Sequence, residues 1–143
     1  MAPHRLLGGC RCGAVSLQVE LSREPGSCHP RACDCDFCRE REAAYVSDPA
    51  GRLRMRARSP ADVRIERQGS LQAEFLSCQA CGTLLVVRWQ DGDRAYGAVN
   101  ARALADRAAF GAEQPASPKQ LGAGQKTERW KALWFADVGL DIG

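Results

Sequence analysis

Short runs of alternating apolar and polar residues recur along the first hundred positions of the chain. Val15, Leu17 and Val19 alternate with polar residues, and the run 53–57 alternates with arginines. Because successive side chains of a strand point to opposite faces, each run predicts a half-buried strand. Further short apolar runs predict strands around 63–65, 71–75, 83–89 and 95–100. We therefore expect a mainly β chain.

The remaining segments carry different patterns. The run 101–110 is rich in alanine and leucine and predicts a short helix. Prolines and glycines in 111–126 predict a long exposed loop, and the tail 127–143 holds Trp130, Trp134 and Phe135, which could cover a core edge or wall a pocket. At 143 residues the chain is expected to form a single domain over 1–143.

Charge argues against nucleic acid as a partner, and hydropathy excludes a membrane span. The 20 basic and 17 acidic residues give a net charge of only +3, which disfavours nucleic-acid binding through the phosphate backbone. No apolar run approaches the roughly 18 residues that a membrane span needs. The first residues also lack the apolar core of a secretory signal, so we expect a cytoplasmic protein.

Cysteine usage is the feature that departs from an ordinary small domain. The chain has 8 cysteines. In a reducing compartment, clustered cysteines more often bind metal than form disulfides. All but Cys28 fall into close groups, which are Cys10 with Cys12, Cys33 with Cys35 and Cys38, and Cys78 with Cys81.

The first and last groups together offer four thiolates, the number that a closed tetrahedral zinc site takes. Glycines flank both pairs and permit the backbone turns that such a site needs. We therefore predict a structural zinc that ties the first strand to a late hairpin. The competing interpretation is a set of buried thiols without metal, since free cysteine is often buried. The ligands predicted for this zinc are Cys10, Cys12, Cys78 and Cys81.

The middle group offers a second zinc only three thiolates, from Cys33, Cys35 and Cys38. Three protein ligands with an exchangeable fourth position are typical of catalytic zinc. Three thiolates leave zinc a weak Lewis acid but a good host for another sulfur, so we expect a thiol substrate. The alternative is a closed structural site in which Cys28 or His29 is the fourth ligand.

Three sequence segments resemble the glutathione-dependent formaldehyde-activating enzyme family, which includes the centromere protein V relatives. They are Gly-Cys-Arg-Cys-Gly-Ala-Val at 9–15, Cys-Asp-Cys-Asp-Phe-Cys-Arg at 33–39 and Phe-Leu-Ser-Cys-Gln-Ala-Cys-Gly-Thr at 75–83. A weaker match at 99–106 extends the resemblance over about 8–106, leaving the loop and aromatic tail of 111–143 outside it.

The resemblance implies a β-tent fold, in which zinc pins antiparallel sheets as in R-type methionine sulfoxide reductases, with one or two short helices. It implies two zinc ions per chain, held by the two cysteine sets named above, and glutathione as substrate or co-substrate. The implied activity is that of a carbon–sulfur lyase that forms or cleaves S-hydroxymethylglutathione.

The chain departs from the family pattern around the second zinc. Asp34 stands where the family often has histidine, and the stretch 41–45 replaces a Thr-Gly-Ser-like segment. Because these positions surround the predicted second zinc, the departures bear on which substrate is bound rather than on the fold. Because Arg binds carboxylates through its planar fork, arginines are candidate contacts for glutathione, as are two aromatic residues that could wall a pocket. The candidates are Arg39, Tyr45, Arg11, Trp130 and the arginines 52, 54, 56 and 58.

A non-catalytic zinc module that binds protein or nucleic acid is the competing functional class. The arginine-rich strand around 52–58 is its main support, although a solvated strand face explains the same charges. A sulfoxide reductase activity is excluded by the lack of a cysteine after Cys81.

Overall fold

The computed structural model describes residues 4–33, 36–40, 43–67, 72–105, 107–116 and 122–142. Its strands are β1 (His4–Gly9), β2 (Val15–Leu21), β3 (Arg31–Cys33), β4 (Ala44–Val46), β5 (Arg52–Ala57), β6 (Val63–Arg67), β7 (Glu74–Cys78), β8 (Leu84–Asp91), β9 (Arg94–Asn100), β10 (Gln114–Ala116) and β11 (Val138–Ile142). The helices are α1 (Asp36–Glu40) and α2 (Ala123–Leu133), with 3-10 turns η1 (Pro25–Ser27), η2 (Pro60–Asp62), η3 (Ala101–Ala103) and η4 (Arg107–Ala109).

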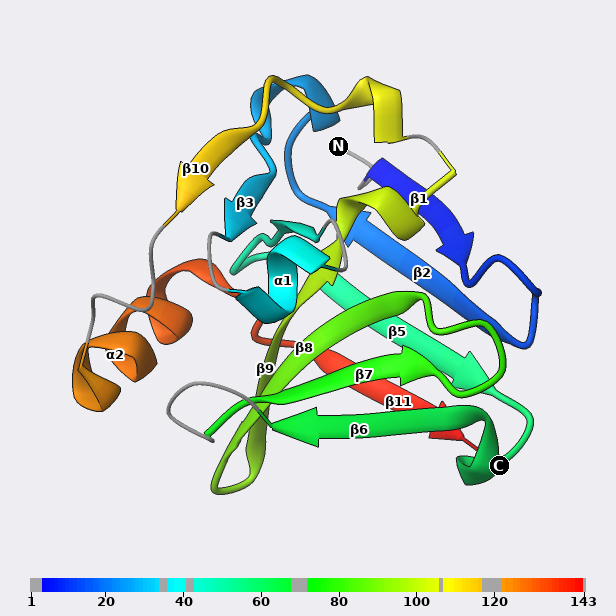
Figure 1. Cartoon of the computed structure of the whole chain (residues 1–143). Helices are drawn as coiled ribbons and strands as arrows, with labels where there is room; N and C mark the ends of the chain where they lie inside the picture. Colours follow the sequence, from blue (N-terminus) through cyan, green and yellow to red (C-terminus); the bar gives the residue numbers. More distant parts are fainter. Residues whose placement is uncertain are drawn as a thin grey trace.

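The strands form two sheets, seen at different depths in Figure 1. One sheet has the order β1-β2-β5-β11, and the other has the order β10-β3-β4-β9-β8-β7-β6. Most neighbouring strands are antiparallel, while β11 runs parallel to β5 and β10 runs parallel to β3. The predicted mainly β fold of two sheets is thus confirmed.

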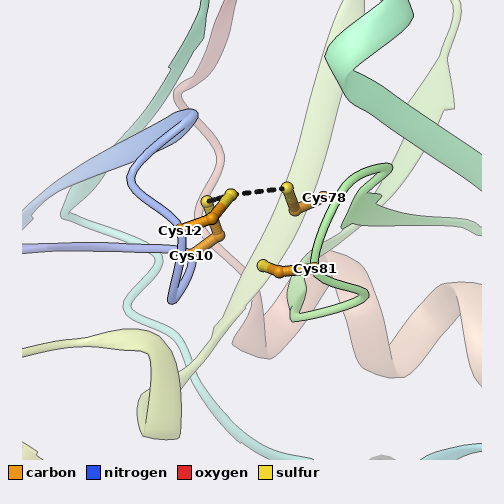
Figure 2. Close-up of side chains that lie close together, drawn as sticks. All are labelled: Cys10, Cys12, Cys78 and Cys81. Carbon is orange, nitrogen blue, oxygen red and sulfur yellow. Dashed lines mark hydrogen bonds between the residues drawn. The ribbon is translucent and has the colours of Figure 1, made fainter.

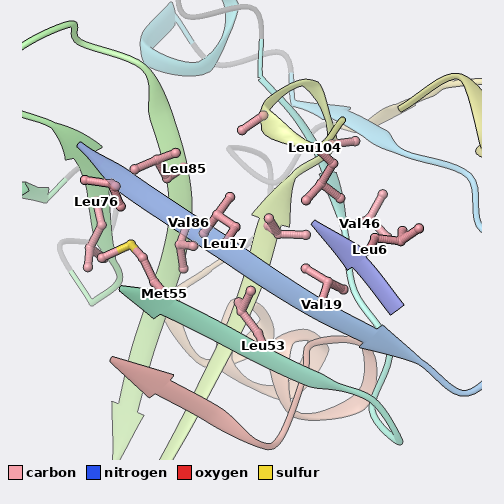
Figure 3. Close-up of a cluster of buried hydrophobic side chains, with 14 of the residues drawn as sticks. Leu6, Leu17, Val19, Val46, Leu53, Met55, Leu76, Leu85, Val86 and Leu104 are labelled. Carbon is pink, nitrogen blue, oxygen red and sulfur yellow. The ribbon is translucent and has the colours of Figure 1, made fainter. Parts of the chain in front are cut away.

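Alternation along β2 and β5 builds the inner face of the smaller sheet. Antiparallel pairing places Leu17 opposite Met55 and Val19 opposite Leu53, and all four side chains are buried. They meet the inner face of the larger sheet in one apolar cluster (Figure 3). The fully buried Phe135 belongs to the same cluster. The two sheets therefore share a core made of their inward-facing side chains.

A second apolar cluster covers part of the outer face of the larger sheet. Trp130 of α2 stacks on Trp134, with ring centroids 4.7 Å apart, and lies 5.6 Å from the Trp89 ring of β8. Cys38 and Tyr45 are buried in the same cluster. The tryptophans of the tail thus attach α2 to the sheet, in the same cluster as Cys38.

Two predicted elements are wrong. The expected helix at 101–110 is replaced by η3 and η4, because Leu104 forms an antiparallel bridge with Gly8 and interrupts any helical run. The segment 111–126, expected to be a long loop, contains β10 and the start of α2, since β10 gains backbone pairing with β3.

The strand expected at 71–75 begins later, at Glu74, and Leu71 lies outside the described residues. Within the part of the chain that the structure describes, no helix has the length and apolar character to cross a membrane.

Candidate metal centre

The turn between β1 and β2 presents two thiols on one side. The Gly13 N–H donates to the Cys10 carbonyl (3.2 Å) to close the turn, and the Val15 N–H donates to the Cys10 sulfur (3.2 Å). Gly13 has a φ of +81°, which side-chain-bearing residues rarely adopt. The glycine therefore allows the tight turn that brings Cys12 back towards Cys10.

The turn between β7 and β8 is built in the same way. The Gly82 N–H donates to the Cys78 carbonyl (2.9 Å), and the φ of Gly82 is +76°. The Thr83 hydroxyl lies 3.1 Å from the Cys81 sulfur. Both turns are thus formed by a cysteine pair and a glycine in the left-handed region, as the sequence spacing predicts.

The two turns face one another, as Figure 2 shows. The sulfur atoms of Cys10, Cys12, Cys78 and Cys81 all lie within 4.8 Å of one another. The Cys10–Cys12 and Cys12–Cys78 sulfur separations are each 3.5 Å. Four thiolates bound tetrahedrally to zinc at about 2.3 Å would be about 3.8 Å apart. The donor set and its spacing therefore fit a tetrahedral metal ion.

The pKa values of the thiols in this group also favour a bound cation. Although burial raises it, hydrogen bonds from Thr83 lower the pKa of Cys81 to about 5. The Ala14 N–H lowers the pKa of Cys12, but interactions with Cys10 and Cys78 outweigh it and raise this pKa to about 12. Because neighbouring thiolates repel, the protein alone does not ionise all four groups, whereas a bound dication does.

Arg11 joins the two turns. Its Nε donates to the Thr83 hydroxyl (3.3 Å), and one of its terminal nitrogens donates to the Cys81 carbonyl (3.0 Å). Arg11 was a candidate contact for glutathione, and the structure places its guanidinium at this four-cysteine centre. Sequence reasoning did not identify Thr83 as part of this centre. Its position directly after Gly82 is the signal that could have identified it.

The second cysteine group is described only in part. Cys33 ends β3, Cys35 and Asp34 lie outside the described residues, and Cys38 is a buried residue of α1. The Cys38 sulfur is 3.1 Å from the Tyr45 hydroxyl, within hydrogen-bonding distance. Tyr45, a candidate glutathione contact, thus lies beside one predicted ligand of the second zinc. Arg39, in the last turn of α1, is exposed.

Cys28 and His29, the two candidates for a fourth ligand at the second zinc, make contacts different from those of Cys38. Cys28 packs into the cluster between the sheets, whereas Cys38 belongs to the outer cluster. The Cys28 sulfur lies 3.8 Å from the Glu24 carbonyl oxygen. The Nδ1 atom of His29 is 2.9 Å from the carbonyl oxygen of Ala112, near β10.

The arginines of β5 alternate outward, as predicted, and lie near carboxylates of β11 and of the residue just before it. Arg54 lies 2.9 Å from Asp137, and Arg52 lies 3.4 Å from the same carboxylate. Arg56 is 3.8 Å from Asp141 of β11. Arg58 is exposed. These arginines therefore lie on the smaller sheet with nearby counter-charges.

Comparisons with known proteins agree with these features. The family model described as "Glutathione-dependent formaldehyde-activating enzyme" matches residues 5–119 of the chain. No curated protein gives a significant match. The crystal structure of a Rhodobacter sphaeroides protein, a structural-genomics target, superposes with a TM-score of 0.51 at 20% sequence identity, covering 94% of this chain and 98% of that chain. At this identity the likeness concerns the fold alone.

Proposed function

The chain belongs to the glutathione-dependent formaldehyde-activating enzyme family, and on that premise we propose that it is a zinc-dependent enzyme of the carbon–sulfur lyase type. Its substrate would be a glutathione adduct, nominally S-hydroxymethylglutathione. The observation that carries the proposal is the family match over 5–119, which spans both turns of the four-cysteine centre and the second cysteine group. We assign this activity to the cytoplasm, where thiolate ligands remain reduced.

Two zinc ions would have different tasks in this proposal. The four-cysteine centre would hold a structural zinc, since all four positions are filled by the chain. The second zinc would be held by Cys33, Cys35 and Cys38, and when bound it would offer a position to the substrate thiolate. The burial of Cys38 beside Tyr45 supports a role for this corner of the fold.

The proposed reaction forms one carbon–sulfur bond. The glutathione sulfur adds to the carbonyl carbon of formaldehyde, and the thiol proton ends on the former carbonyl oxygen to give the hydroxymethyl thioether. The reverse reaction breaks the same bond and returns the proton to sulfur. The chain's part is to bind and orient the thiol, for which Tyr45, Trp130 and Arg39 are the candidate contacts, since orientation alone lowers the barrier substantially.

Metal content tests the proposal directly. We expect two zinc equivalents per chain by elemental analysis, one of which a mild chelator removes. Glutathione should bind the zinc-loaded protein in calorimetry and, with formaldehyde, give the adduct in proton NMR spectra.

Two cysteine variants separate the proposal from a closed, non-catalytic second site. Cys38→Ala should lose the labile zinc and glutathione binding, whereas Cys28→Ala, the matched control, should keep both. A single tight zinc, with the middle cysteines all alkylated rapidly, would overturn the catalytic assignment. Loss of the labile zinc from Cys28→Ala would instead identify Cys28 as the fourth ligand of a structural site.

A further inference from the structure

Arg31 is a partly buried arginine on the larger sheet. It begins β3, and its Nη2 atom donates to the hydroxyl of the buried Ser47 at 2.6 Å. Among the described residues, no Asp or Glu forms an ion pair with it. Because a guanidinium has five N–H groups, a single hydroxyl leaves most of its donors for another group.

Arg88 shows how the same fold treats another partly buried arginine. Its Nη1 atom lies 2.9 Å from a Glu74 oxygen, so its charge is balanced within the protein. Removing a charge from water without a partner is costly. Arg31 therefore carries a positive charge that no ion pair within the described part of the chain balances and that a bound anion would neutralise.

The location of Arg31 links this charge to the second cysteine group. Arg31 is directly opposite Tyr45 in the antiparallel β3–β4 pair, so the two side chains share one face of the sheet. The Tyr45 hydroxyl is 3.1 Å from the Cys38 sulfur. A molecule with its sulfur near Cys38 can therefore extend an anionic group along Tyr45 towards Arg31.

We propose that Arg31 binds the glycine carboxylate of the glutathione adduct. This inference rests on the proposed function, because it takes the thiol substrate as the source of the carboxylate. The glycine end of glutathione carries only a negative charge, whereas its γ-glutamyl end also carries an ammonium group that a guanidinium would repel. Arginine binds a carboxylate through two parallel hydrogen bonds, which fixes its orientation.

Calorimetry with two ligands and the Arg31→Met variant tests the assignment. Wild-type protein should bind glutathione about 10- to 100-fold more tightly than the monoethyl ester blocked at the glycine carboxylate, as expected for a lost charged hydrogen bond. Arg31→Met should bind both ligands alike, at the affinity of the ester. The matched control is Arg5→Met, which changes an exposed arginine of β1 that pairs with Glu20 of β2. This variant should behave as wild type.

Thermal stability distinguishes ligand binding from a structural role. Because Arg31→Met removes an uncompensated charge and keeps an apolar side chain of similar length, its melting temperature should be unchanged or higher. If the variant does not fold, phenylglyoxal labelling of the wild-type protein replaces it. Bound glutathione should then protect Arg31 from modification, as read by peptide mass spectrometry, whereas the ester should not.

The outcomes separate this inference from the proposed function. If the wild-type protein binds glutathione but Arg31→Met still prefers the acid over the ester, the carboxylate assignment is wrong and the proposed function stands. If the wild-type protein does not bind glutathione, the proposed function fails. In that case acetate decides the carboxylate site by itself, because protection of Arg31 from phenylglyoxal supports the site and lack of protection refutes it.

Discussion

Replacing Gly82 by alanine isolates the backbone strain at one turn of the metal centre. The φ of Gly82 is +76°, and a methyl group added there meets no heavy atom within 4 Å. Packing therefore adds nothing, and the cost is that of holding a side-chain-bearing residue in the left-handed region, about 1–2 kcal/mol. For a chain of this size, such a loss lowers the melting temperature by about 3–8 °C.

Gly124 provides the matched control in the same protein. A methyl group added to Gly124 also meets nothing within 4 Å, but this residue is the second residue of α2. Alanine is the better helix former, so Gly124→Ala should raise the free energy of unfolding by up to about 0.5–1 kcal/mol, the value for a helix interior. The same chemical change thus has opposite signs at the two positions because only the backbone conformation differs.

Urea unfolding of both variants in excess zinc, followed by circular dichroism, measures the two changes. The reasoning would be refuted by a Gly82→Ala variant as stable as the wild type, since the turn would then not require a positive φ. Equal effects at both positions would show that the added methyl group, rather than the backbone, determines the result.

Three further predictions concern other parts of the fold. Although burial raises it, hydrogen bonds from Ser22 and Ala50 lower the pKa of Asp48. The stability that this lowered pKa provides is present above about pH 4 and is lost as the pH falls through the folded-state pKa. The free energy of unfolding of Asp48→Asn, measured between about pH 5 and 2, should therefore fall less steeply than that of the wild type. Thr83→Val removes the hydroxyl beside Cys81 and should weaken zinc binding about 10- to 100-fold in chelator competition, and unchanged affinity would refute that role. Phe135→Ala should lower the free energy of unfolding in urea by about 3–5 kcal/mol, because this side chain is fully buried between the sheets, and a loss under 1 kcal/mol would contradict that packing.

The sequence predicts those parts of the fold that depend on local patterns. Alternation identifies β2 and β5, and the Cys-Gly spacing identifies both turns of the four-cysteine centre. The helix expected at 101–110 is absent, since the pairing of Leu104 with Gly8 involves residues almost a hundred positions apart. Such long-range pairing has no local signal, and the same applies to β10, whose partner β3 is distant in sequence.

The candidate site is predictable to a similar extent. Cysteine spacing is sufficient to group the four thiols that the structure brings together. Arg31, in contrast, lies two residues before Cys33, but this spacing does not set it apart from the other arginines near the cysteine groups. What distinguishes it is partial burial beside Ser47 and Tyr45 with no ion pair to a carboxylate of the described residues, and this depends on how β3 and β4 pair. The chain contains 20 basic residues, so composition alone could not select this one.

The four-cysteine centre closes a long loop of the chain, and this affects how the protein can evolve. The segment between Cys12 and Cys78 contains Arg31, Cys38 and Tyr45, which we assign to substrate recognition, while the cysteines that would hold the structural zinc lie at its ends. Substitutions within the loop can therefore change which ligand is bound without altering the four-cysteine centre at its ends. This separation would allow related proteins to evolve specificity for other thiol substrates while keeping their thermal stability, which mutations for new activity commonly lower.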